Sequence, residues 1–353
     1  MGDMMKGNIA IAEAAVRAGV KLYAGYPITP STEIMEYLSK RLPEVGASFI
    51  QAESELAGIN MVMGAASCGV RALTASSGPG ISLKQEGISC ISDEELTCVV
   101  INVVRYGNGL GTLYSAQCDY HRETRGGGNG DYRCIVLSPG SIQEAVDLMA
   151  TAYELAEKYR IVTVMMTEGA LGQMMEPCDL PDFIEPEKLP WGMDGKYSYK
   201  KIGIFDRNSM TEAVDLNKKH DTIKANEQRW EDDGLEDADY VFVAYGLPGR
   251  SVKGAVRELR EEGHKVGFIR PITTWPFPIK AFEKVNRDVK GFISVEANAT
   301  GQLIDDVALA AKETVKDRNV PAYCLPCVYG IPSIRFTKEG LGKIINGEIK
   351  ERY

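Results

Sequence analysis

The sequence predicts an α/β protein built on a doubly wound parallel sheet and followed by a second, smaller α/β domain. Strand and helix patterns alternate through residues 7–167, which is typical of a parallel sheet with helices on both faces. Residues 97–104 form an apolar run, as expected for a central strand buried on both sides. The alternation restarts after about residue 235, so we predict domains at residues 1–234 and 235–353.

The expected elements of the first domain follow one another at short spacing. Its strands are predicted at residues 20–24, 47–50, 70–75, 97–104, 134–137 and 161–167. Its helices are predicted at residues 8–18, from residue 33 until Pro43 ends the helix, at 51–66, after the turn at 76–82 and through Cys90, and at 141–159. Residues 106–133 form a long glycine-rich loop without a dinucleotide-binding fingerprint. Loops of this length are usually functional or disordered.

A connector of about residues 177–234 joins the two domains. Residues 177–190 are rich in proline and acidic side chains, and residues 209–233 have the pattern of a polar, solvated helix. The second domain has predicted strands at 240–245, 266–269 and 291–296, and predicted helices at 251–262 and 301–315.

Composition limits the partners of the chain. Its 353 residues are 44% hydrophobic and 25% charged, as in an ordinary soluble protein, and its formal net charge is −9. The absence of a basic cluster argues against nucleic acid and anionic membranes as partners. No apolar run reaches the roughly 18 residues of a membrane span, and residues 1–6 lack the apolar stretch of a signal peptide. We therefore expect a cytoplasmic protein.

The eight cysteines are scattered, and in a reducing compartment they are expected to be free thiols. Cys324 and Cys327 form a single CxxC pair in a proline-rich turn. Without a second pair or a downstream histidine, this spacing gives little support for a metal or redox role. The sequence also lacks a four-cysteine iron–sulfur run.

The most distinctive stretch is residues 25–33, a strand-to-helix turn stiffened by Pro27 and Pro30. Thr29 lies at its tip, where α/β proteins bind ligands outside the carboxyl ends of their strands. An alternative interpretation makes Thr29 a simple helix N-cap with Pro30 at the first helical position.

Two acids and one arginine are further candidates. Glu53 and Glu55 open the predicted helix at 51–66, whose small, apolar composition indicates burial. Both could simply complement the helix dipole, or one could be a functional acid, and periodicity does not choose between them. Arg105 follows the apolar strand and suits a carboxylate ligand, with a structural ion pair as the alternative.

Several segments, in order and at similar spacing, resemble the α subunit of 2-oxoacid:ferredoxin oxidoreductases. They are residues 26–30, 51–55, 77–83, Arg105, 270–271, 275–278, Glu296 and 301–302. Further segments resemble the branched-chain (2-oxoisovalerate) class most closely, namely residues 65–66, 84–89, 126–133 and 171–177.

This resemblance implies a thiamine-diphosphate enzyme that decarboxylates a 2-oxo acid, transfers the acyl group to coenzyme A and reduces ferredoxin. It implies a pyrimidine-binding first domain and a transketolase C-terminal-like second domain. Glu53 corresponds to the catalytic acid that binds the aminopyrimidine ring, and Pro27 to a cofactor-contacting residue. Thr29 and Arg105 correspond to residues that hold the oxo acid. No metal ligand is expected on this chain.

The resemblance also implies partner subunits. The family's G-D-G motif, which anchors the diphosphate through a metal ion, is absent here and lies on the family's β subunit. Iron–sulfur clusters are expected on partner subunits, and the expected partners include an iron–sulfur (ferredoxin-like) subunit and a γ subunit. Pyruvate or 2-oxoglutarate remain alternative substrates. A non-catalytic α/β binding subunit and a transketolase-like enzyme that works without ferredoxin remain alternative functions.

Overall fold

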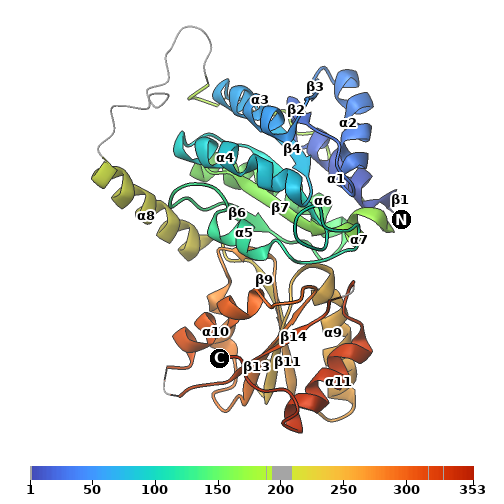
Figure 1. Ribbon diagram of the computed structural model, residues 1–353, viewed down its shortest axis with the longest axis vertical. Helices are drawn as coiled ribbons and strands as arrows, with labels where there is room; N and C mark the ends of the chain where they lie inside the picture. Colours follow the sequence, from blue (N-terminus) through green and yellow to red (C-terminus); the bar gives the residue numbers. More distant parts are fainter. Residues whose placement is uncertain (1, 188, 193–208, 317, 329) are drawn as a thin grey trace.

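The computed structural model places two helix-covered sheets one above the other (Figure 1). It describes residues 2–187, 189–192, 209–316, 318–328 and 330–353. In that part of the chain no helix is long and apolar enough to cross a membrane.

The elements follow the predicted order closely. Up to residue 178 they are β1 (Asp3–Lys6), α1 (Gly7–Arg17), β2 (Leu22–Gly25), α2 (Thr32–Glu44), β3 (Ser48–Gln51), α3 (Glu55–Ser67), β4 (Ala72–Ser76), α4 (Pro79–Asp93), β5 (Val99–Val104), α5 (Tyr120–Arg125), β6 (Ile135–Leu137), α6 (Ile142–Tyr159), β7 (Thr163–Glu168), α7 (Gly169–Gln173) and β8 (Met175–Cys178). From residue 209 they are α8 (Ser209–Asn226), β9 (Trp230–Asp233), β10 (Tyr240–Val243), α9 (Gly246–Glu261), β11 (Val266–Pro271), β12 (Thr273–Trp275), the 3₁₀ helix η1 (Ile279–Lys284), β13 (Gly291–Glu296), α10 (Leu303–Thr314), β14 (Ala322–Pro326) and α11 (Ile334–Ile345).

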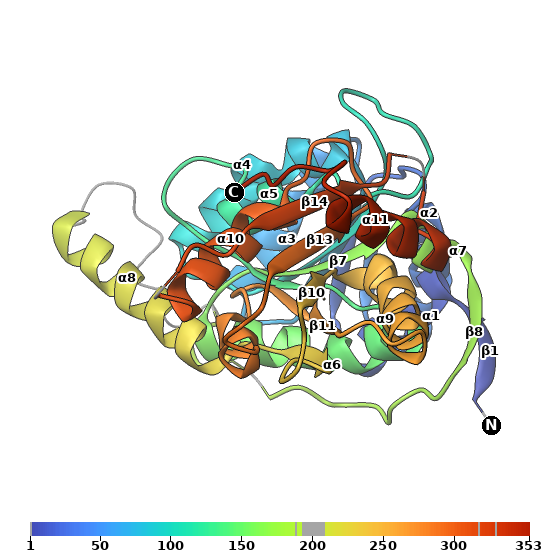
Figure 2. The same ribbon diagram turned by 90° about the horizontal axis from the view of Figure 1, so that it is seen from below.

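The larger sheet has the strand order β12-β6-β7-β5-β4-β2-β3. All of its strands except β12 run parallel, and the fully buried strand β5 lies at its centre. Helix α1 packs against α2 and α6, whereas α3 packs against α4. Figure 2 shows α3 and α4 on one side of the strands and α6 on the other. The predicted doubly wound parallel sheet is therefore confirmed.

The smaller sheet has the order β14-β13-β10-β11-β9, with β9 as its antiparallel edge strand. Helices α9 and α11 pack together, and α10 packs on β13 from the other side (Figure 1). The mixed α/β architecture predicted for the C-terminal part is thus also confirmed.

Two strands tie the sheets together along the chain. Strand β9 precedes residue 235 but pairs with β11, and β12 follows residue 235 but pairs antiparallel with β6 of the larger sheet. The prediction of one helix across 209–233 is wrong, because α8 ends at Asn226 and residues 230–233 form β9. The division at 234/235 remains a prediction about the domains.

Two other local predictions need correction. Residues 106–133 contain the short helix α5, so this loop is partly regular. The helix expected at 251–262 begins earlier, at Gly246, directly after Tyr245. The N-terminal strand β1 and β8 form a separate antiparallel ribbon on the side of the molecule opposite α8 (Figure 2).

The interface between the sheets is a network of buried polar groups. The Gln117 amide donates to Glu168 Oε1 (2.7 Å) and to the carbonyl of Tyr245 (3.0 Å), and its oxygen accepts from the Ala297 N–H (3.1 Å). Burial raises the pKa of Glu168 to about 7. Such a network fixes how the two sheets meet, because each buried group requires its partner.

Candidate active site

The turn between β2 and α2 presents Thr29 to solvent at the carboxyl end of β2. Ser31, not Thr29, occupies the N-cap position of α2, and the Ser31 hydroxyl donates to the carbonyl of Ile28 (2.8 Å). The Asn8 amide donates to the carbonyl of Pro30 (2.8 Å) and holds the turn from α1. The alternative that Thr29 is merely a helix cap is therefore wrong. Its side chain is exposed on a fixed turn.

Arg105 lies directly behind this turn. It follows β5, is only 8% exposed, and its Nη1 donates to the carbonyl of Thr29 (2.7 Å). Its Nη2 donates to the carbonyl of Leu110. No described carboxylate forms an ion pair with Arg105. The alternative that Arg105 forms a structural ion pair therefore finds no support in the described residues. The structure brings Arg105 and Thr29 together, and each terminal nitrogen of Arg105 keeps a second N–H.

The two acids of the 51–55 segment have different environments. Helix α3 begins at Glu55, and Ser54 is its N-cap, accepting from the Ala57 N–H (3.2 Å). Glu53 therefore precedes the helix rather than opening it, and its side chain is exposed. Glu55 is only 6% exposed. Among the described residues, none donates a hydrogen bond to either carboxylate.

Glu55 and Arg105 are linked through the turn between β4 and α4. A Cβ on Gly78, whose φ is +48°, would lie 2.9 Å from Arg105 Nε, and a Cβ on Gly80 would lie 2.6 Å from Glu55 Oε1. Only glycine allows both side chains to approach this backbone so closely. The same Cβ on Gly80 would lie 2.2 Å from Ser76 Oγ. The structure therefore gathers Thr29, Arg105 and Glu55 around one turn, while Pro27 is half-buried in the Thr29 turn.

Several buried polar atoms on the floor of this site have no partner within the described chain. They are Ser76 Oγ, Ser77 Oγ and Arg105 Nε. An unpaired buried donor is costly, so such atoms mark positions where water or a ligand group binds. The nearly buried carboxylate of Glu55 lies beside these atoms, so the site offers both hydrogen-bond donors and an acceptor to a polar ligand.

Lys84, which the sequence analysis did not single out as a site residue, lies beneath Glu55. It is fully buried on α4, and its ammonium group donates to the carbonyl of Glu55 (3.3 Å). Burial lowers the pKa of Lys84 to about 8, and the negative charge of Glu55 opposes that shift. Nothing in the local pattern distinguishes this lysine from a solvated one on a helix surface.

A second buried cluster supports the Gly78 turn from α5. Arg122 donates to the carbonyl of Gly78 (3.1 Å) and pairs with Asp119 and with Glu123 (3.1 Å). Asn102 of β5 donates to both carboxylates at 3.0 Å. Burial raises the pKa of Asp119 and of Glu123. The only signal for this cluster in the sequence was the unusual length of the 106–133 loop.

The CxxC pair lies away from these residues, at the end of β14. The Cys324 thiol donates to Glu296 Oε1 at 3.7 Å, and burial raises the pKa of Cys324 to about 12. Such a thiol is protonated and unreactive at neutral pH. All eight cysteines are thiols outside any disulfide, as predicted.

Comparison with known proteins decides the family. A family model described as pyruvate flavodoxin/ferredoxin oxidoreductase, thiamine diphosphate-binding, matches residues 13–234, and one described as pyruvate:ferredoxin oxidoreductase core domain II matches residues 238–324. The chain belongs to the 2-oxoacid:ferredoxin oxidoreductase family. The resemblance inferred from the sequence motifs is confirmed.

Members of this family with curated names are similar along most of their length. The chain is 44% identical to the ketoisovalerate oxidoreductase subunit VorB of Methanothermobacter marburgensis, covering 88% of this chain and 90% of that protein. It is 37% identical to the 2-oxoglutarate synthase subunit KorA of Methanocaldococcus jannaschii, covering 88% and 92% respectively. Both relatives are named as subunits.

Solved structures share the fold. A 2-oxoglutarate:ferredoxin oxidoreductase from Magnetococcus marinus, solved with 2-oxoglutarate, coenzyme A and succinyl-CoA, superposes with a TM-score of 0.84 at 24% identity. The match covers 98% of this chain but only 65% of that one. An inactive β4 tetramer of a split-gene transketolase superposes with a TM-score of 0.60 at 13% identity, covering 97% and 99%.

Proposed function

We propose that this chain is the α subunit of a cytoplasmic complex that oxidatively decarboxylates a branched-chain 2-oxo acid. The products are the acyl-CoA, carbon dioxide and reduced ferredoxin. The observation that carries this proposal is the 44% identity to a ketoisovalerate oxidoreductase subunit over 88% of the chain. The alternatives of pyruvate and 2-oxoglutarate concern the substrate and leave the reaction class unchanged.

The chain's own residues suit one half of a thiamine diphosphate site. When bound, this cofactor supplies a carbon nucleophile for the keto group and accepts the electrons left by decarboxylation. Glu55, or the sequence-based candidate Glu53, hydrogen-bonds the aminopyrimidine and promotes loss of the proton that activates the cofactor. Burial favours Glu55, because a carboxyl enclosed by protein is better isolated from water than the exposed Glu53. Pro27 contributes a wall of the cofactor site.

Thr29 and Arg105 act on the oxo acid in this proposal. The Thr29 hydroxyl donates to the keto oxygen as negative charge develops there, and Arg105 attracts the carboxylate. Arg105 also holds the Thr29 turn through the 2.7 Å bond to its carbonyl. Arg122 is engaged by Asp119 and Glu123. Arg105 and Arg122 are therefore both occupied, and neither can recognise a second carboxylate on the substrate. This favours a substrate with an apolar side chain over 2-oxoglutarate.

The diphosphate half of the site belongs to a β subunit in this proposal. In the described residues, no group of three His, Cys, Asp or Glu side chains could hold a metal ion. Several exposed apolar side chains lie on α3, on α4 and in the loops that follow β2 and β5: Tyr26, Leu56, Met61, Leu83, Leu110, Leu113 and Tyr114. A protein surface this apolar is typical of one that another chain covers. Iron–sulfur and γ subunits complete the electron path to ferredoxin.

Steady-state kinetics of the complex reconstituted with its β, γ and ferredoxin-like subunits tests the proposal. Coenzyme A-dependent ferredoxin reduction is measured with 2-oxoisovalerate, pyruvate and 2-oxoglutarate. We expect 2-oxoisovalerate to give the highest kcat/KM. Its margin over pyruvate should be modest, because each methylene in an apolar pocket contributes about 1–3 kcal/mol. A preference for 2-oxoglutarate would replace the substrate assignment, and no reduction with any of the three would contradict the function.

A further inference from the structure

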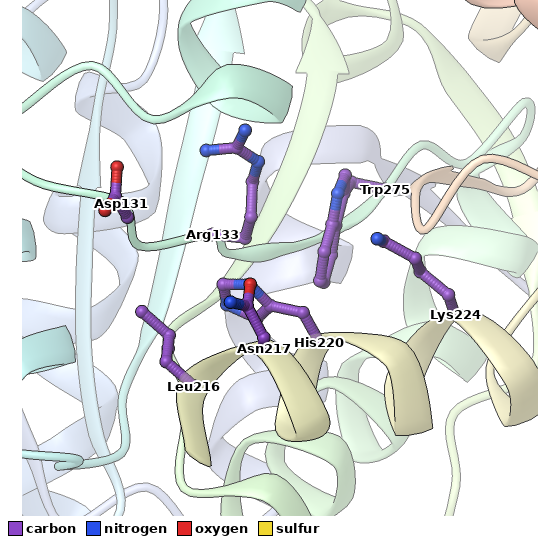
Figure 3. A pocket seen from close by; sticks show the side chains of 7 residues that line it. All are labelled: Asp131, Arg133, Leu216, Asn217, His220, Lys224 and Trp275. Atoms are coloured by element: carbon purple, nitrogen blue, oxygen red, sulfur yellow. The ribbon is translucent and has the colours of Figure 1, made fainter. Parts of the chain in front are cut away.

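A polar pocket of about 280 Å³ lies where α8 meets the loop that precedes β6. Its polar and aromatic walls are Asp131, Arg133, Asn217, His220, Lys224 and Trp275 (Figure 3). Two segments that distinguished this sequence, residues 126–133 and 275–278, therefore meet in one cavity. Neither segment has a role in the proposed reaction.

The pocket is separated from the Thr29 turn by the layout of the sheet. Strands β12 and β6 form one edge, and β2 and β3 the other. Arg133 precedes β6, whereas Thr29 follows β2, and the two strands run in the same direction. The pocket therefore lies at the opposite edge and the opposite end of the strands from Thr29.

Several N–H groups of the pocket-lining residues Arg133 and Asn217 have no hydrogen-bond partner among the described residues. Arg133 donates through Nη1 alone, to the carbonyls of Arg125 (2.8 Å) and Tyr132 (3.0 Å). Within the described chain its Nε and Nη2 have no partner, and no carboxylate forms an ion pair with it. The Asn217 amide likewise has no described partner. An arginine held by its backbone contacts but lacking an anion is prepared to bind one.

His220 and Trp275 add ring donors beside this arginine. The imidazole of His220 is 8% exposed and meets the Trp275 ring edge-on, with 5.5 Å between ring centroids. Burial, together with the positive charges of Arg133, Lys219 and Lys224, lowers the pKa of His220 to about 4, against the opposing charge of Asp221. Two cations, Arg133 and Lys224, and one acid, Asp131, therefore line the cavity beside His220. Figure 3 shows Arg133 and Trp275 standing above His220, with the Lys224 amine directed toward Trp275.

We propose that this pocket binds a phosphate group, either free or as the monoester of a small molecule. Arg133 offers a fork of N–H groups that matches phosphate oxygens, and Lys224 adds a mobile point charge. The cavity volume suits a ligand at the small end of the usual range. Trp275 supplies an aromatic wall for an attached ring. This proposal stands independently of the proposed function, because it uses none of the site residues of the reaction.

Equilibrium dialysis of the assembled complex with inorganic phosphate, AMP and adenosine tests it. Lys224→Gln and Lys218→Gln form a matched pair. Both lysines are exposed on α8, and each has an aspartate partner three residues earlier, at 3.3 Å and 3.5 Å respectively. Only Lys224 faces the pocket. Binding at any other site for phosphate-bearing ligands is the same in every variant, so it does not affect the difference between variants. Arg133→Gln is the second variant, from the opposite wall.

We expect Lys224→Gln and Arg133→Gln each to weaken binding of phosphate or AMP by about tenfold or more, the loss typical of a hydrogen bond to a charged group. Lys218→Gln should bind like the wild type, and circular dichroism should show that all variants are folded. Equal affinity for phosphate and AMP identifies free phosphate as the ligand, whereas tighter AMP binding identifies a monoester. Unchanged binding in either Lys224→Gln or Arg133→Gln, an equal loss in Lys218→Gln, or adenosine binding as tightly as AMP would overturn the proposal.

Discussion

Buried carboxylates occur both at the interface between the two sheets and at the open end of the larger sheet, by which we mean the end that carries Thr29, Glu55 and Arg105. The two places differ in which groups donate hydrogen bonds to the carboxylate. Glu296, at the interface, is fully buried and accepts hydrogen bonds from the Ser294 hydroxyl (2.8 Å), the Asn298 amide (2.9 Å) and the backbone N–H groups that begin α10. Glu55, at the open end, accepts none from the described residues. The described chain therefore supplies hydrogen-bond donors to the carboxylate of Glu296 but none to that of Glu55.

This difference separates structural groups from groups that wait for a ligand or partner. A buried carboxylate with a full set of donors contributes to the packing of the two sheets. A nearly buried one without donors is costly unless another molecule supplies them. The interface therefore explains how the two sheets are held together, and the carboxylate of Glu55 supports the proposal that a second subunit contributes to the site.

The largest expected effect distinguishes the two acids at the open end. In the assembled complex, Glu55→Gln should lower kcat by ~10²-fold or more, as expected when an acid–base function is lost. Glu53→Gln should remain close to the wild type, because its side chain is exposed and lies outside α3. The measurement is ferredoxin reduction with 2-oxoisovalerate under saturating cofactor. The reverse order of effects would return the catalytic role to Glu53, as the sequence motif alone suggested.

Arg105 should show the next largest effect. Arg105→Met removes its charge and its two bonds to backbone carbonyls. We therefore expect kcat/KM to fall on the order of 10- to 100-fold for every 2-oxo acid. Arg105→Lys should recover only part of this loss, because it keeps the charge but not the fork. Arg335→Met, a change of the same kind at an exposed site on α11, serves as the control.

The pattern across substrates makes this test sharper. The order of preference among 2-oxoisovalerate, pyruvate and 2-oxoglutarate should survive in Arg105→Met, since the carboxylate that Arg105 attracts is common to all three. If only 2-oxoglutarate were affected, Arg105 would recognise the distal carboxylate, and the branched-chain assignment would be abandoned.

The smallest effect belongs to the interface. Because burial raises the pKa of Glu168 to about 7, its carboxyl binds a proton more tightly in the folded than in the unfolded chain. Its stabilising contribution is therefore complete below the ordinary carboxyl pKa and is lost as pH rises through about 7. Thermal unfolding should show that the Tm advantage of the wild type over Glu168→Gln becomes smaller between about pH 5 and about pH 8. The corresponding change in the free energy of unfolding should be at most about 3 kcal/mol. A difference that rises with pH would contradict this account of the interface.

Local patterns in the sequence predicted much of the fold. The apolar run at 97–104 indicated the central strand, and the alternation of short strands and helices indicated the parallel sheet. Strand β12 was missed because its pairing with β6 is distant in sequence and its residues lie in a proline-rich run. Strand β9 was missed because its sequence, Trp-Glu-Asp-Asp, is acidic and occupies an edge position.

The candidate site was only partly predictable. The paired prolines identified the Thr29 turn, and the position after the apolar strand identified Arg105. The choice between Glu53 and Glu55 depended on where α3 begins, and Ser54 as an N-cap residue was the available signal. The burial of Lys84 and the ion cluster around Arg122 depend on packing between elements distant in sequence, which no local pattern records.

Binding of thiamine diphosphate tests the central claim most directly. Calorimetry with cofactor and Mg²⁺ should be done on this chain alone and on the assembled complex, with circular dichroism to show that the isolated chain is folded. The account predicts micromolar binding to the complex and weak or no binding to the single chain, because Glu55 and its neighbours form only the aminopyrimidine half of the site. Micromolar binding to the single chain would contradict it.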